Sequence, residues 1–140
     1  MSSFKDHCLD EGKVKSGVKL PLFNRDGSLS DDYIMVRWSW SDNVRAVMDD
    51  MRRDLFDRLV NVTAEMTDKQ KREATQENER ITTMAVLDTR CAQVASWSFS
   101  EKPTKANVTN FLKSRPDTAE RIDVLSAKTK RFFTDSGESS

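Results

Sequence analysis

The chain has 140 residues, enough for one domain that folds on its own core without a metal or disulfide. Its 23 Lys and Arg balance 23 Asp and Glu, whereas proteins that grip DNA phosphates usually carry a basic excess. No apolar run approaches the ~20 residues of a membrane-spanning helix. This composition argues against DNA-binding and membrane proteins, and its three Trp, one Tyr and seven Phe argue against a fully disordered chain.

Residues 1–16 mix charged residues with Ser and Gly and show little periodicity, which predicts a flexible N-terminal arm. Its few apolar residues, Phe4, Cys8 and Leu9, are candidates to dock on another surface such as a neighbouring subunit. The N-terminus lacks the long apolar core of a signal peptide, and Cys91 is the only other cysteine. We therefore expect a cytoplasmic protein with reduced thiols.

Residues 17–40 predict a small antiparallel β-hairpin. Apolar and polar residues alternate over 18–22 and again over 33–38, which is the period of a half-buried strand. Between these runs, residues 24–28 read NRDGS, a strong turn signal because Gly and Asn tolerate positive φ. Pro21 cannot donate a backbone hydrogen bond, so we expect the first strand at an edge of the sheet.

Ser41 is a favourable N-cap and predicts a long amphipathic helix over 41–66. Its apolar positions, expected to face the core, are Val44, Val47, Met48, Met51, Leu55, Leu59, Val62 and Met66. The next segment, 67–80, is almost wholly polar. It indicates either a helix that projects into water, capped by Thr67, or a flexible link.

A second apolar stripe resumes at Ile81 and predicts a helix that continues to Trp97. After a break, Thr104 is a suitable cap for a short third helix. Pro116 suits the first turn of a last helix, which we expect to end at Phe133.

These elements predict a single domain over 17–133, with the arm of residues 1–16 before it and a disordered tail over 134–140 after it. The hairpin takes up 17–40 and the helices 41–133. The fold class is mainly α, of the α+β type, with an N-terminal β-hairpin followed by four helices, two long and two short.

The sequence offers little for catalysis. Its one histidine, His7, lies in the predicted arm, where a mobile side chain cannot hold a general base in position. No Gly-rich phosphate loop and no nucleophile elbow occur, and one His with two distant Cys cannot form a zinc site. The carboxylates of the first long helix alternate with Arg, as on a salt-linked surface. We expect a protein without enzymatic activity, cofactor or metal.

The aromatic residues are more informative. They close the second predicted strand and end two of the predicted helices. Neighbouring positions on a helix point ~100° apart, so adjacent aromatic residues cannot all pack inward. Exposed aromatic side chains on a highly charged surface suggest a site for an apolar surface of another protein. We nominate Trp40, Phe99 and Phe133 as partner-binding residues.

The order of these features resembles the tail assembly chaperones of long-tailed bacteriophages, over about residues 17–133. The pieces that carry the resemblance are, in order, the turn Asp26-Gly27, the helix start from Trp38 to Arg45, the long charged middle, the segment from Cys91 to Phe99, the segment from Pro103 to Val108, Phe111-Leu112, Arg115-Pro116, Ile122-Asp123 and Phe132-Phe133. The polar insert 67–80 and the paired Trp38 and Trp40 depart from the pattern.

The resemblance implies a non-catalytic helper of virion assembly in the host cytoplasm that is absent from the mature virion. Such a chaperone binds the tape measure protein, keeps it soluble and helps recruit tail tube subunits. The family often makes a longer form by programmed ribosomal frameshifting, and that form would carry the contact with the tube protein. Self-association as a homo-oligomer is a further expectation, whereas nucleic acid and membranes are not expected partners.

Two other classes of function remain open at this stage. A structural protein of the virion or its neck would share the helical fold and the lack of catalytic groups. A small DNA-binding regulator would use the basic cluster over 128–131, although residues 101–140 carry only 8 basic against 6 acidic residues.

Overall fold

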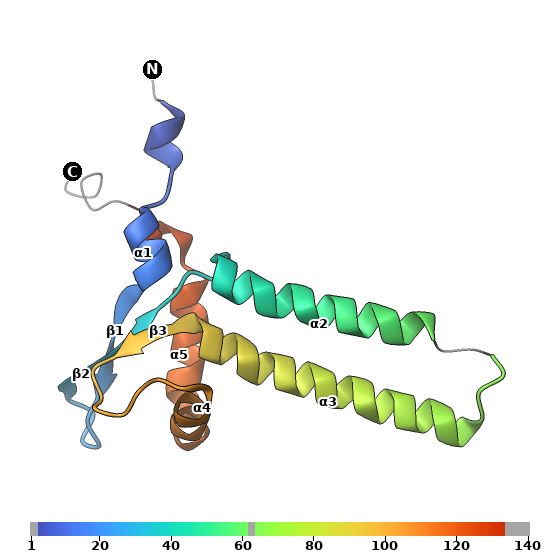
Figure 1. Cartoon of the computed structure of the whole chain (residues 1–140). Helices are drawn as coiled ribbons and strands as arrows, with labels where there is room; N and C mark the ends of the chain where they lie inside the picture. Colours follow the sequence, from blue (N-terminus) through green and yellow to red (C-terminus); the bar gives the residue numbers. More distant parts are fainter. Residues whose placement is uncertain (1–2, 62–63, 134–140) are drawn as a thin grey trace.

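The computed structural model describes residues 3–61 and 64–133 (Figure 1). They form a small body, in which helices pack on an antiparallel sheet, and a pair of long helices that projects from it. The predicted fold class is confirmed: an N-terminal hairpin leads into two long and then two short helices.

The sheet begins with the predicted hairpin. Strand β1 (Val18–Phe23) pairs antiparallel with β2 (Leu29–Val36), with Leu20 opposite Ile34. The connecting turn needs Gly27, whose φ is +87°, and the Asp26 carboxylate accepts a 2.9 Å hydrogen bond from the Ser28 amide. Strand β1 lies at an edge of the sheet, as expected from its proline.

Residues 94–97 differ from the sequence prediction. They form strand β3 (Val94–Trp97) on the other side of β2, whereas the apolar spacing predicted a helix as far as Trp97. Ile34 lies opposite Trp97, and the Arg37 amide donates a 2.7 Å hydrogen bond to the Gln93 carbonyl. Pairing with a strand some sixty residues earlier therefore overrides the local helical pattern.

The N-terminal segment is partly folded onto the body rather than wholly loose. A 3₁₀ turn, η1 (Phe4–His7), precedes the short helix α1 (Glu11–Ser16). Leu9 and Val14 pack against the core, and the Asp10 amide donates a 2.8 Å hydrogen bond to the Phe132 carbonyl. These contacts join α1 to the body, within the segment 1–16 that the sequence predicts as a flexible arm. The predicted tail 134–140 lies outside the described residues.

The core lies between the sheet and helices α4 (Lys105–Ser114) and α5 (Pro116–Ser126). The caps at Thr104 and the first-turn position of Pro116 are as predicted. The last helix is shorter than expected because the chain leaves it after Ser126. A 3₁₀ turn, η2 (Thr129–Phe132), then brings the fully buried Phe132 into the core, near Trp38. The fully packed cluster consists of Val18, Leu20, Leu22, Ile34, Val36, Val94, Val108, Leu112, Ala119, Ile122, Leu125 and Phe132.

Helices α2 (Asp42–Val60) and α3 (Asp68–Gln93) lie side by side and form the projecting arm (Figure 1). The predicted helix over 41–66 ends early, at Val60, and its Val62 lies outside the described residues. Thr67 caps α3 through reciprocal hydrogen bonds with Gln70, so the polar segment is a helix and not a link. Of the described residues between 42 and 89, none belongs to the core cluster.

Candidate partner-binding groove

The two arm helices share a thin apolar contact. Only Val44, Ile81 and Ala85 are buried among the apolar side chains described along α2 and the facing part of α3. Polar contacts complete the seam, among them a 3.4 Å ion pair between Arg58 and Glu77. A helix pair with so few buried apolar residues leaves apolar surface beside the seam available to another protein.

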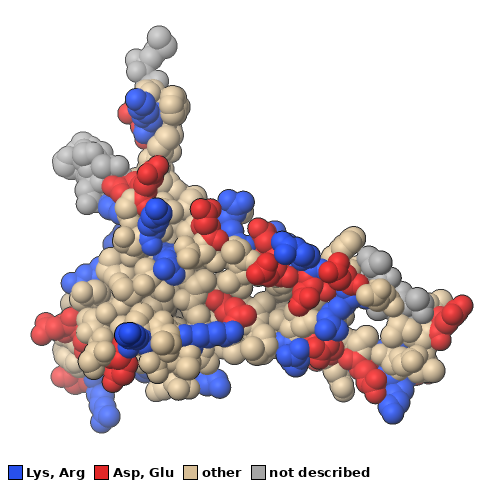
Figure 2. Space-filling model, viewed as in Figure 1, with Lys and Arg blue, Asp and Glu red and all other residues tan. Residues whose placement is uncertain are grey.

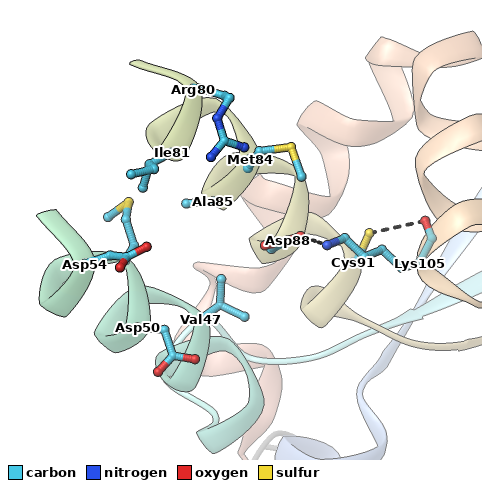
Figure 3. A pocket seen from close by; sticks show the side chains of 11 residues that line it. Val47, Asp50, Asp54, Arg80, Ile81, Met84, Ala85, Asp88, Cys91 and Lys105 are labelled. Carbon is cyan, nitrogen blue, oxygen red and sulfur yellow. Dashed lines mark hydrogen bonds and ion pairs between the residues drawn. The ribbon is translucent and has the colours of Figure 1, made fainter. Parts of the chain in front are cut away.

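One side of this seam is hollowed into a groove, shown in Figure 3, which we call the arm groove. Its floor is formed by the half-buried Val47 and Met51 from α2 and by Ile81, Met84 and Ala85 from α3. The Met84 side chain is 40% exposed. The other lining residues are Asp50, Asp54, Arg80, Asp88, Cys91 and Lys105.

The rim of the arm groove is charged. At the end nearest the body, Lys105 from α4 forms an ion pair with Asp88, and this hydrogen bond raises the pKa of the Lys105 ammonium. Further out, Arg80 pairs with Glu77, which raises the pKa of its guanidinium, while Asp50 and Asp54 line the α2 side. Figure 3 shows this apolar floor between charged margins.

A floor of this composition suits a helix better than a small molecule. Met side chains are flexible and polarizable, so Met51 and Met84 can adapt to different apolar side chains. The groove is open along the arm, as a surface that receives the apolar face of an amphipathic helix must be. The charged rim can pair with polar residues at the edges of such a helix.

The structure places the three nominated aromatic residues in different surroundings. Trp40 is 64% exposed and lies at the root of the arm, just before α2. Phe99 is half-buried, with its ring centroid 5.2 Å from those of Trp97 and Phe111. Phe133 is half-buried, and its carbonyl accepts a 2.7 Å hydrogen bond from Lys13. No ring contact joins any two of the three nominees within the described part of the chain.

The arm groove itself was not found from the sequence. Met51 and Met84 have the helical spacing of core residues, and we expected the apolar side of both long helices to be buried. On α3 the groove is lined by residues of the segment 80–91, of which only Arg80 belongs to the polar segment that follows Thr67, so no feature of the local sequence marks it.

Comparisons with models of known protein families, with curated proteins and with solved structures find no match. Along residues 3–61 and 64–133, no helix combines the length and the apolar character needed to cross a membrane. The same residues contain no group of three or more His, Cys, Asp or Glu side chains placed to hold a metal ion. The arm groove and the resemblance of the sequence are therefore the features that bear on function.

Proposed function

We propose that this protein is a phage tail assembly chaperone that acts by binding and not by catalysis. It holds the tape measure protein soluble in the host cytoplasm, helps recruit tail tube subunits through a frameshifted longer form, and does not remain in the mature virion. The resemblance of the sequence suggests the client, and the arm groove suggests how the client is held.

The observation that carries the proposal is the half-open, methionine-lined groove between α2 and α3. A helical segment of the client lays its apolar face on Met51, Ile81 and Met84, in the manner of a helix in a groove. Burial of apolar surface on both partners supplies the affinity, at roughly 25 cal/mol per Å². The same burial hides client surface that would otherwise aggregate.

The charge on the arm suits this role. Figure 2 shows Lys and Arg interspersed with Asp and Glu over the projecting helices. Mixed charges on the outside of a complex favour solubility, and their near balance avoids strong attraction to nucleic acid. A chaperone that coats a long client needs both properties, because many copies would bind side by side.

The test is co-expression of the chain with the tape measure protein of the same phage genome. The wild-type chain is expected to raise the soluble fraction of its client and to co-purify with it. Met84→Asp places a charge in the groove and is expected to reduce the recovered complex about tenfold or more. The reason is the large free-energy cost of burying an unpaired carboxylate against an apolar face.

Val86→Asp is the matched control. Val86 lies on the same helix with a similar exposed fraction, 47%, and does not line the arm groove. This variant is expected to recover as much complex as the wild type. The proposal fails if the client is equally soluble without the chain and no complex can be isolated. The groove is the wrong site if Met84→Asp and Val86→Asp recover the same amount of complex.

A further inference from the structure

A second exposed surface of the arm lies on a different side of α2 from the arm groove. Near the tip, Phe56 is 64% exposed and Leu59 is 69% exposed, and Trp40 at the root is 64% exposed. None of the three lines the arm groove. These three large side chains, one just before α2 and two near its C-terminal end, leave apolar area that no described residue of this chain covers.

Between these apolar ends lie three charged residues of α2, Arg45, Asp49 and Arg52, all of them exposed. Among the described residues none of the three has an ion pair, although neighbouring Arg53 pairs with Asp50 at 3.6 Å. Their charges are therefore available to pair with complementary charges of another molecule.

The five α2 residues form one stripe, which we call the α2 stripe: Arg45, Asp49, Arg52, Phe56 and Leu59. Their spacing alternates between four and three residues. At ~100° per residue they fall within an arc of about 80°, clear of the side that lines the groove. This alternation is the spacing of positions that share one seam in paired helices, here with charged residues at its centre and apolar residues at its outer end.

The order of residues in the α2 stripe is complementary to itself when read backwards. With a two-fold axis midway between Asp49 and Arg52, an antiparallel copy places Asp49 against the partner's Arg52. The same register places Arg45 against the partner's Phe56, a cation over an aromatic ring. It also brings the partner's Leu59 to the root of the arm, at the level of Asp42.

We propose that the α2 stripe pairs with the same stripe of a second copy of this chain, in an antiparallel two-fold dimer. A second copy supplies by symmetry an Arg for Asp49 and an Asp for Arg52, whereas nothing on this face fixes the order of charges in a client helix. The pairing buries both apolar ends and gives each unpaired charge a partner. Two symmetric Asp–Arg pairs then fix the register.

The length of α2 sets the strength expected of this dimer. Its 19 residues span about 28 Å, and the contact is about one helix wide, so the footprint is on the order of 300 Å² per copy. Interfaces of this size belong to the weak end of specific association. We therefore expect a dimer with a dissociation constant in the micromolar range, measurable at concentrations up to about 500 µM.

The dimer does not depend on the proposed function. The arm groove lies on another side of the arm and stays open in the dimer, so loss of self-association leaves the groove able to bind. A failure of client binding in the Met84→Asp experiment likewise leaves the dimer prediction standing.

Charge reversal tests the dimer. By analytical ultracentrifugation, Asp49→Arg and Arg52→Asp are each expected to raise the dissociation constant about tenfold or more, since each replaces two attractions with two repulsions. The double variant, Asp49→Arg with Arg52→Asp, is expected to dimerise again. An equimolar mixture of the two single variants is expected to form a heterodimer, because both contacts between positions 49 and 52 then join an Arg to an Asp.

Asp57→Arg is the control, since Asp57 is exposed on α2 but lies outside the stripe; it is expected to dimerise like the wild type. Circular dichroism of each variant verifies that α2 is still folded. The proposal is overturned if the wild-type chain is monomeric up to about 500 µM. It is also overturned if both single reversals leave the dimer unchanged, or if neither the double variant nor the mixture restores association.

Discussion

At the scale of single residues, two glycines share a backbone conformation but not an environment. Gly17 has φ of +88° and Gly27 has φ of +87°, both in the region that L side chains rarely adopt. A Cβ added at Gly17 would lie 2.7 Å from the Val36 carbonyl oxygen, in the first pair of the hairpin, whereas a Cβ at Gly27 would meet nothing within 4 Å.

Changing each glycine to alanine should separate backbone strain from steric clash. Gly27→Ala is expected to lower the free energy of unfolding by about 1 kcal/mol, the cost of positive φ alone. Gly17→Ala is expected to cost about 3 kcal/mol, because strand β2 must also move away. Urea unfolding of both variants measures the difference. Equal losses would mean that the contact with Val36 relaxes without cost.

Individual side chains also mark where sequence reasoning stops. Hydrophobicity and size drew attention to Trp40, Phe99 and Phe133, but an exposed fraction depends on what packs above a residue. Phe99 gains neighbours from α4, which its local sequence does not reveal. Met84 stays 40% exposed because it lies beside the helix seam, at the open side of the arm groove. Neither outcome is encoded in the spacing around the residue itself.

At the scale of elements, local chemistry made the hairpin turn and the starts of three helices predictable. The turn before Ser28, the caps at Thr67 and Thr104 and the proline that opens α5 each act on backbone groups within a few residues. Strand β3 escaped prediction because its identity comes from pairing with β2 far along the chain. The early end of α2 escaped prediction because apolar residues continue at helical spacing beyond it.

The two threonine caps allow the stability of the arm to be compared with that of the body. Both hydroxyls accept a hydrogen bond from an amide three residues on, at 3.1 Å for Thr67 and 3.2 Å for Thr104. Thr104→Ala is expected to lower the global free energy of unfolding by about 1 kcal/mol, because α4 belongs to the core.

Thr67→Ala removes an equivalent cap at the tip of the arm, where α3 packs on little. Its effect is expected to stay local: amide exchange over the first turns of α3 speeds up about fivefold, while the global unfolding midpoint hardly changes. Hydrogen exchange with mass spectrometry reports both. If Thr67→Ala lowered the global stability as much as Thr104→Ala, the arm and the body would unfold as one unit.

At the scale of the whole molecule, the body holds the packed core and the arm offers exposed surface for binding. The fully packed cluster draws on the sheet, α4, α5 and η2. The arm joins it at the ends of α2 and α3, where the Arg37 guanidinium donates hydrogen bonds to the carbonyls of Ala92 and Val94. The α2 stripe lies beyond this joint, and the arm groove extends outward from it, with Cys91 and Lys105 at its inner end.

This division predicts that the body folds without the arm. Met48 and Thr89 lie across the seam with their sulfur and hydroxyl 3.8 Å apart, so a short Gly-Ser linker of about five residues can replace residues 49–88. The shortened chain loses the buried Ile81 and Ala85 and the ion pair of the half-buried Asp88 with the exposed Lys105, but no member of the core cluster. Its free energy of unfolding is therefore expected to stay within about 2 kcal/mol of the full chain, because exposed ion pairs contribute little.

Thermal and urea unfolding measure that stability, and the same shortened chain is expected to bind no tape measure protein and to remain monomeric. A cooperative transition combined with loss of both associations would place stability in the body and recognition in the arm. A shortened chain that fails to fold would instead mean that the arm seam, thin as it is, completes the structure. A folded one that still dimerises would move the self-association surface from α2 to the body.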